Sequence, residues 1–456
     1  MTGDVRGHVF PKWGPRGPFR VYSWTQASVT VLGLVCSALL LVAGMGGPAL
    51  LLVVFLGGMT LRDPTGTPAW TRVGLGLRYL ASGWMGRRRW KATDDRPRPG
   101  WLADVSVSEC DLAHGVMGLV KDRGRYLAAM RVSPTRDPLL QSDSDREVAA
   151  DDWARVVTSL PIETVDRLQV LTVSRRGGGE QVLADASRAD GPGLEVLKEV
   201  AGYLADHVRC TDTVLVVRLS HSAARDAVKR GGEEAAGRVL HSILQHLGGL
   251  LPTEQLRAEI LAPADWTTLL GSVLDVVGNR VRAVDGLPAP NEVQERWNSV
   301  TVGETVHRVV WMWQWPQRPM ASGFLAPLLT GPGNRVVSIL VAPAEPEAHQ
   351  RSLDWSYRRA RAAVETAKSS RHRKEAEMDS LDRQLRELNE GHVPVEVLAT
   401  VGLSGATEDE VEDLTGMIRS NAVAGSCRVA TLGGSQLRSF PWVLPLCRGL
   451  DRGVDG

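Results

Sequence analysis

Two apolar runs, RLQVLTV (167–173) and TVLVVRL (213–219), are the main indication of the fold in this stretch of the chain. Both runs are short, rich in β-branched residues and nearly free of charge, as is typical of buried strands. After each run comes a segment with apolar residues every three or four positions, LEVLKEVAGYLADHV (194–208) and AAGRVLHSILQHLGGL (235–250), which predicts a helix. Strands that alternate with helices in this way predict an α/β (α+β) fold.

The same alternation continues on both sides of this stretch. On the amino side, the runs 116–122 and 126–132 flank Arg123-Gly124 and predict a β-hairpin. On the carboxyl side, AEILA (258–262) predicts a strand and ADWTTLLGSVLDVV (264–277) a helix. Ferredoxin-like β-α-β units with antiparallel pairs and a doubly wound sheet both fit this order.

A polar, proline-containing stretch at 285–298 predicts a boundary between two cytosolic α/β domains. The predicted domains span 101–290 and 291–456. Near the end of the second, a strand, a capped helix and a strand are predicted at 393–403, 407–424 and 426–432. These three elements form a further β-α-β unit.

The run VHRVVWMWQW (306–315) opens the second domain with three tryptophans. Strict alternation along a strand predicts that Trp311, Trp313 and Trp315 share one face. Such a face ordinarily packs into the protein's own core, and a docking surface for another subunit is the functional alternative. The three indoles are therefore candidate partner-docking residues.

Residues 347–390 are strongly charged and carry two apolar seams in heptad phase. Polar residues at 371–374 interrupt the seams, so either one long charged helix or a helical hairpin fits. Leu381 and Leu385 in the second seam are further candidate docking residues. The basic run at 371–374 is interpreted as a solvated face, and nucleic acid is not expected as a direct partner.

The residues between Arg20 and Arg62 include no Asp, Glu, Lys or Arg. They contain VLGLVCSALLLVAG (31–44) and PALLLVVFLGGM (48–59), separated by glycines and a proline. A span needs about 20 apolar residues, so a two-helix transmembrane hairpin at about 24–61 is predicted, with one span plus a re-entrant piece as the rival. Basic residues flank both ends, which predicts a multi-pass protein of the cell membrane with both termini cytoplasmic.

Residues 1–100, the predicted membrane anchor, hold 13 Lys and Arg against 4 Asp and Glu. The segment after the hairpin mixes tryptophans with a basic cluster, a composition that suits the lipid headgroup layer. Arg87, Arg88, Arg89 and Lys91 are the candidate lipid-headgroup contacts. A connector with ordinary juxtamembrane charges is the alternative.

Motifs that would indicate an enzyme are missing from the sequence. There is no G-x-x-x-x-G-K-[ST] loop and no G-x-S-x-G, and no two cysteines form a C-x-x-C pair. His241 and His246 are five residues apart and miss the spacing of a helical zinc site. We therefore expect a non-enzymatic protein with no catalytic, cofactor or metal site. A membrane-anchored enzyme whose site is assembled from distant residues is the alternative.

The sequence resembles integral-membrane proteins of actinobacterial conjugative or mobile-element loci in the hairpin, the long charged helix and the runs 311–329, 334–352 and LGGSQLRSFPWVLPLCRGL (432–450). This resemblance implies a structural component of a type IV secretion-like DNA-transfer apparatus, with a soluble part similar in plan to the amino-terminal region of the secretion ATPase. The partners implied by the resemblance are the secretion ATPase, other membrane subunits and membrane lipids. A homo-oligomer is a further possibility. A membrane component of the type VII secretion apparatus, which also joins a hairpin to a cytosolic domain, is the alternative.

Overall fold

A computed structural model describes most of the region from 69 to 450. It covers residues 69–112, 115–134, 161–176, 209–251, 256–275, 282–316, 324–329, 331–344, 346–365 and 394–450, with parts of 33–50, 153–160, 195–200 and 378–388. Most of the predicted hairpin (24–61) and of the predicted helix 194–208 lie outside these residues. Within the described part, no helix is long and apolar enough to cross a membrane. The two-helix anchor therefore stays a prediction.

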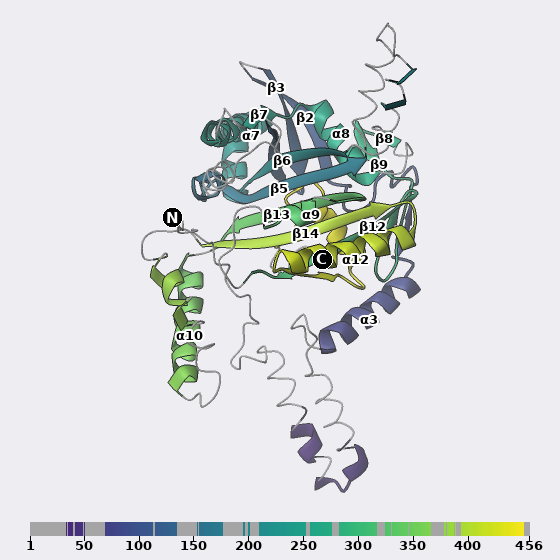
Figure 1. Cartoon of the computed structure of the whole chain (residues 1–456), viewed down its shortest axis with the longest axis vertical. Helices are drawn as coiled ribbons and strands as arrows, with labels where there is room; N and C mark the ends of the chain where they lie inside the picture. The colour runs from purple at the N-terminus through teal and green to yellow at the C-terminus, as the bar shows by residue number, and fades with distance from the viewer. Residues whose placement is uncertain are drawn as a thin grey trace.

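The described strands and helices confirm the mixed α/β class (Figure 1). The strands are β1 (Arg89–Lys91), β2 (Val105–Leu112), β3 (Gly115–Asp122), β4 (Arg125–Pro134), β5 (Val165–Arg176), β6 (Arg209–Leu219), β7 (Leu256–Ile260), β8 (Arg282–Val284), β9 (Leu287–Ala289), β10 (Glu292–Glu295), β11 (Val300–Val302), β12 (Thr305–Gln314), β13 (Asn334–Pro343), β14 (Val395–Gly405) and β15 (Arg428–Thr431). The helices are α3 (Ala69–Trp84), α7 (His221–Leu250), α8 (Pro263–Leu274), α9 (Ala326–Leu329), α10 (Pro346–Glu365), α12 (Glu408–Ala424) and α13 (Gln436–Ser439), followed by the 3-10 turn η2 (Phe440–Val443).

Thirteen of the strands form a single sheet in which every pair is antiparallel. Its order is β1-β10-β11-β12-β14-β13-β5-β6-β4-β3-β2, with β15 beside β12 and β7 beside β4. The predicted runs at 167–173, 213–219 and 258–262 lie in or overlap β5, β6 and β7. Because neighbouring strands of a doubly wound sheet are mostly parallel, that alternative is wrong for the described strands.

Two ferredoxin-like units follow one another along this sheet. In the first, β4, β5, β6 and β7 lie in the spatial order β7-β4-β6-β5, with α7 between β6 and β7. In the second, β12, β13, β14 and β15 lie in the order β15-β12-β14-β13, with α12 between β14 and β15. Strands β4 and β12 are both 10 residues long, and β6 and β14 are both 11. The two units thus repeat one topology, which confirms the ferredoxin-like prediction.

The two units meet edge to edge through β5 and β13. These strands pair antiparallel, with Val170 opposite Ile339 and Gln169 opposite Leu340. The predicted boundary at 285–298 contains β9 and β10, and β10 belongs to the same continuous sheet. The division into 101–290 and 291–456 remains a prediction about independent folding.

Apolar side chains pack on both faces of the sheet. On one face, α7 packs on the first unit and α12 on the second, and each helix covers its own cluster of buried apolar side chains. Ile339 and Val397 contact both clusters, so the two helices lie on the same face. The opposite face packs against α8, the residues around Trp101 and the carboxyl-terminal segment around Phe440. Both faces are buried, which explains why the strands are nearly continuous apolar runs.

Glycine sets the local geometry at two predicted elements. The β3–β4 turn has positive φ at Arg123 (49°) and Gly124 (74°), as a tight hairpin turn requires. In α7, Gly231 and Gly232 have non-helical angles and mark a kink. The predicted helix 235–250 is the part of α7 after that kink.

The predicted long helix 347–390 is described in two parts. The first is α10, which projects beyond the sheet (Figure 1), and the second comprises helical residues within 378–388. The residues at which one long helix and a helical hairpin would differ lie outside those described. Both alternatives stay open.

Candidate functional site

Helix α3, the first long helix of the described chain after the predicted anchor, ends in a glycine cap. The Gly86 N–H donates to the Gly83 carbonyl at 3.1 Å and the Arg87 N–H to the Ser82 carbonyl at 2.9 Å, with Gly86 at φ 66°. Arg88 turns back over this end, where its Nε donates to the Tyr79 carbonyl at 2.9 Å and its guanidinium lies 3.5 Å from the Tyr79 ring centroid. A cation here complements the negative end of the helix.

Strand β1 fastens the end of α3 to the edge of the sheet. Arg89, Trp90 and Lys91 pair with Gln294, Val293 and Glu292 of β10. The Arg89 guanidinium forms an ion pair with the Glu292 carboxylate, and Lys91 Nζ lies 3.7 Å from the same group. The hydrogen bond from Arg89 is the main cause that lowers the pKa of Glu292. These contacts are exposed, so they position the strand more than they stabilise it.

The tip of the β10–β11 loop forms the next contact with α3. The Trp297 ring meets the Tyr79 ring edge-on, with centroids 5.0 Å apart. Behind it, the Trp297 carbonyl accepts a hydrogen bond from the Gly434 N–H at 2.7 Å. A Cβ on Gly434 would lie 2.7 Å from the indole, and its φ of +69° also favours glycine. The indole is therefore held between α3 and a glycine turn.

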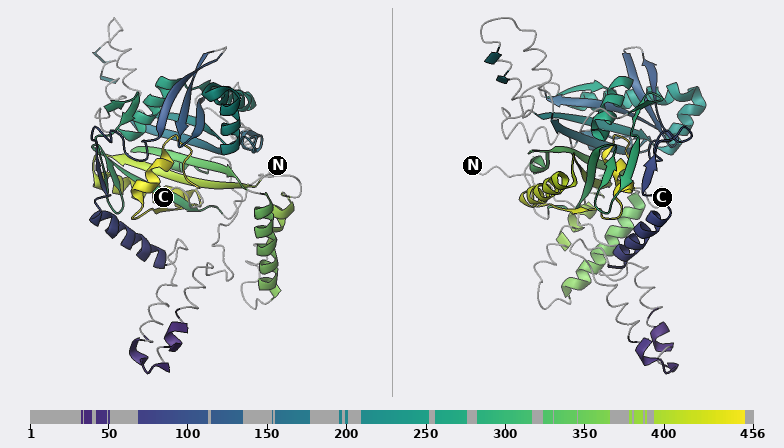
Figure 2. Two further views of the ribbon diagram at one scale, coloured as in Figure 1. Left: turned by 180° about the vertical axis from the view of Figure 1, so that it is seen from behind. Right: turned by 90° about the vertical axis from the view of Figure 1, so that its right-hand side faces the viewer.

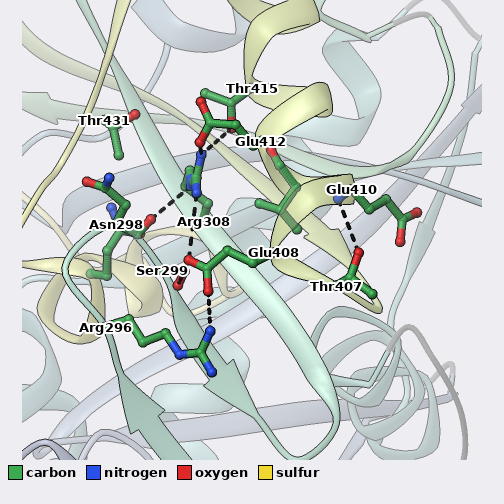
Figure 3. A network of polar contacts seen from close by, with 12 residues as sticks. Arg296, Asn298, Ser299, Arg308, Thr407, Glu408, Glu410, Glu412, Thr415 and Thr431 are labelled. Atoms are coloured by element: carbon green, nitrogen blue, oxygen red, sulfur yellow. Dashed lines mark hydrogen bonds and ion pairs between the residues drawn. The ribbon is translucent and has the colours of Figure 1, made fainter.

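The same loop is bound to the start of α12 by the polar network in Figure 3. Arg296 pairs with Glu408, and Ser299 Oγ donates to Glu408 Oε1 at 2.7 Å. Burial opposes ionisation of Glu408, but the hydrogen bonds from Ser299 and Arg296 outweigh it, so the pKa of this carboxyl lies below its ordinary value. Buried Arg308 on β12 donates to the Asn298 carbonyl at 2.9 Å and pairs with Glu412.

Helix α12 begins at the Thr407 cap that its sequence predicts, but Glu410 binds the residue before Thr407 and not Thr407 itself. Thr407 Oγ1 accepts from the Glu410 N–H at 3.2 Å, and Glu410 Oε2 accepts from the Ala406 N–H at 2.9 Å. Acidic residues in the first turn also favour the positive end of the helix. Together, α3, the β10–β11 loop and the start of α12 form a joint between the predicted anchor and the second unit, hereafter the α3 joint.

The four candidate lipid contacts directly follow α3, in its glycine cap and in β1. Arg88, Arg89 and Lys91 have the protein partners described above, and Arg87 is exposed. These partners are compatible with a position beside headgroups and also with the plain connector, so lipid contact stays a prediction.

The three candidate docking tryptophans do not share one face. Trp315 is 8% exposed and packs with Val310 and Met312 on the α12 side of the sheet. A β-bulge between Met312 and Gln314 shifts the register, and strict alternation fails there. Trp311 and Trp313 are half-buried, and Arg428 lies 6.0 Å from the Trp313 ring centroid. The prediction of a common face is wrong at Trp315.

The two candidate docking leucines are placed on the helical stretch within 378–388. Leu381 and Leu385 are both half-buried. Their role in docking stays a prediction.

The strongest pKa shifts belong to groups in the core. Burial lowers the pKa of His307 to about 4 and raises those of Cys427 and Cys447 to about 11 and 12. Among the residues that the structure describes, no three His, Cys, Asp or Glu side chains are grouped as metal ligands would be. The three groups with these shifts are all buried in the core.

Two shallow hollows lie along α7 and β7, and no motif in the sequence pointed to them. One, of about 280 Å³, is lined by residues that include Val116, His241 and Gln245. The other, of about 650 Å³, is lined by residues that include Leu244 and Arg257. Non-local packing of a helix against an edge strand creates both.

Part of the chain matches a known protein family. Residues 208–312 match the family described as "Putative type VII ESX secretion system translocon, EccE". The matched segment runs from β6 through α7, α8 and the β10–β11 loop into β12, and so contains Trp297, Arg308 and Trp311. A search of curated proteins found no match. The match supports similarity to a secretion-system family, and it does not support the conjugative, type IV assignment drawn from 311–329 and 432–450.

Proposed function

We propose that this protein is a non-enzymatic membrane component of a type VII-like secretion apparatus. The family match over residues 208–312 is the observation that carries the proposal. It favours the type VII alternative over the conjugative one. The amino-terminal hairpin would anchor the chain, with both termini cytoplasmic, and the thirteen-stranded sheet would stand at the inner face of the cell membrane.

The α3 joint supports a structural role for the thirteen-stranded sheet and its helices. Tyr79, Trp297 and Glu408 link the segment after the anchor to the β10–β11 loop and then to α12. Such a chain of ring contacts and partly buried polar contacts would hold the sheet at a fixed position relative to the anchor. The protein would bind a secretion ATPase and neighbouring membrane subunits, and it would make no direct contact with nucleic acid.

Co-purification from membranes tests this proposal. The full-length protein, tagged at its carboxyl terminus, would be extracted from the membranes of its own cells and isolated. We expect the ATPase of a type VII system to accompany it. Recovery from the cytosolic fraction, isolation without any secretion subunit, or isolation with a conjugative ATPase would each contradict the proposal.

A pair of variants connects the test to the matched segment. Trp311→Ala removes a half-buried ring inside that segment, and Val423→Ala shortens a 67% exposed side chain outside it. If the matched segment carries the docking surface, Trp311→Ala lowers ATPase recovery while the thermal unfolding midpoint stays close to that of the parent. Val423→Ala then leaves recovery unchanged. The enzymatic alternative has no observation in its favour within the described ranges.

A further inference from the structure

Helix α3 carries an apolar stripe that the α3 joint leaves uncovered. Val73, Leu77, Leu80 and Trp84 are 44%, 63%, 60% and 95% exposed. They are spaced by four, three and four residues, which aligns them along one side of a helix. Met85, just after the helix, is also exposed, at 56%. Four large apolar side chains in one row are an unusual surface for a monomeric body.

The opposite side of α3 is the one that contacts the protein. Leu75 and Tyr79 are half-buried, and Tyr79 meets Trp297 and Arg88. The stripe therefore faces away from this contact, and α3 extends beyond the strands in both views of Figure 2. The helix is fixed by one side, and the residues that the structure describes leave its other side uncovered.

Charge and chain position identify what covers the stripe. The helix has two arginines and no acidic residue, and the basic cluster at 87–91 follows directly. Only six residues separate Arg62, the end of the uncharged stretch, from Ala69 at the start of α3. Six extended residues reach about 20 Å at most, so α3 starts close to the membrane if the uncharged stretch spans it. An apolar stripe beside cationic side chains matches the boundary between anionic headgroups and acyl chains.

The geometry points to α3 as an interfacial helix that lies flat on the inner leaflet, with Val73, Leu77, Leu80 and Trp84 inserted among the lipids. Arg87, which is exposed and follows the end of the helix, then lies at headgroup level. Because α3 is bound to Trp297 and to β10, its orientation on the bilayer sets the orientation of the whole sheet. This inference rests on the membrane attachment proposed above and adds the surface that meets the lipid.

Spin labels on the full-length protein test the inference. Cysteines are placed singly at Leu77, Leu80 and Gly74 in a background with exposed Cys36 and half-buried Cys210 replaced by Ser, and each protein is reconstituted into vesicles of phosphatidylglycerol and phosphatidylcholine. Gly74 is the matched control, since it is exposed, lies off the stripe, and a Cβ there meets nothing within 4 Å. Collision rates with oxygen, which concentrates in lipid, and with a nickel chelate, which stays in water, are then measured.

The inference expects the ratio of oxygen to nickel collisions to be several-fold higher at Leu77 and Leu80 than at Gly74. Equal ratios at the three positions would overturn it, and so would labels at Leu77 and Leu80 that are immobilised and shielded from both reagents, because a protein partner or a second copy would then cover the stripe. Sedimentation of the same vesicles separates this outcome from failure of the proposed function. Protein that remains with the vesicles but shows equal ratios refutes only the role of α3.

Discussion

Gln169 on β5 accepts a hydrogen bond of 2.8 Å from the backbone N–H of Cys447 through its side-chain oxygen. Its amide nitrogen donates to the Leu444 carbonyl at 2.9 Å and to Ser338 Oγ on β13 at 2.8 Å. Gln169 is fully buried at the seam between the two units. One side chain therefore joins the first unit, the second unit and the carboxyl-terminal segment.

Replacing Gln169 with Leu should destabilise the protein strongly. The Cys447 N–H and the Leu444 carbonyl would lose this buried partner, and each unsatisfied group costs about 1–3 kcal/mol. We expect a loss of about 2–5 kcal/mol in the free energy of unfolding, measured by urea titration of tryptophan fluorescence. Gln294→Leu, at an exposed position of β10, is the control and should change it by less than about 0.5 kcal/mol. Equal effects of the two changes would contradict the assigned role.

Arg448 and Asp122 form a buried pair that fixes the end of the described chain to β3. Arg448 Nε and Nη2 donate to the two Asp122 oxygens at 2.8 and 2.5 Å, and both side chains are less than 10% exposed. Arg448→Met should cost about 3–5 kcal/mol, because it leaves a buried carboxylate without its partner. Adding Asp122→Leu should recover part of that loss in a double-mutant cycle of urea unfolding. If the two changes are simply additive, the pair is not coupled.

Trp315 should behave as a core residue. Trp315→Ala removes a ring that is 8% exposed, and truncations of this size cost about 3–5 kcal/mol. The thermal unfolding midpoint, followed by circular dichroism, should fall by several degrees or more. Trp84→Ala, at 95% exposure, should leave it nearly unchanged. A Trp315→Ala protein of parental stability that no longer binds its partner would instead assign Trp315 to a docking surface.

His307 should make stability depend on pH in the mildly acidic range. Its Nε2 lies 3.2 Å from the Leu274 carbonyl, which can only accept, and its Nδ1 lies 2.8 Å from Ser404 Oγ, so the buried ring is neutral with the proton on Nε2. Burial lowers its pKa to about 4, whereas the unfolded chain has the ordinary value near 6.5. The unfolded state therefore binds more protons between these values, and stability falls as pH decreases from 6.5 to 4.

The size of this effect follows from the shift in pKa. About two and a half pKa units correspond to a loss of about 3 kcal/mol by pH 4. Unfolding free energies measured by urea at a series of pH values would show it. His307→Gln should flatten the curve over this range, and exposed His221→Gln is the control that should keep it. A curve that is unchanged in His307→Gln would assign the pH dependence to other groups.

Local patterns in the sequence predicted the parts of the fold but not their assembly. The hairpin at Arg123-Gly124 and the cap at Thr407 were found because each depends on adjacent residues. The pairing of Val170 with Ile339 was not predictable, since two apolar strands far apart in the chain carry no local signal of register. The β-bulge that turns Trp315 into the core was missed for a related reason, because one extra residue in a strand leaves no mark on an alternating pattern.

The candidate site was predicted in part. The basic cluster at 87–91 drew attention to the end of α3, but its paired strand on β10 and the Trp297 contact depend on residues about 200 positions away, as the register of Arg89 with Gln294 illustrates. The apolar stripe of α3 follows a helical period, yet only the structure distinguishes its covered side from its exposed one.

The pairing of β5 with β13 has a consequence for assembly. Each ferredoxin-like unit binds the other through the outer edge of its second strand, β5 in the first unit and β13 in the second. The two units therefore resemble a dimer within one chain, and the backbone hydrogen bonds of these two edges are already formed. An unpaired edge strand can bind a strand from a neighbouring molecule, but the edges of β5 and β13 are already paired with each other. Copies of this protein that gather in a complex must therefore meet through other surfaces than these.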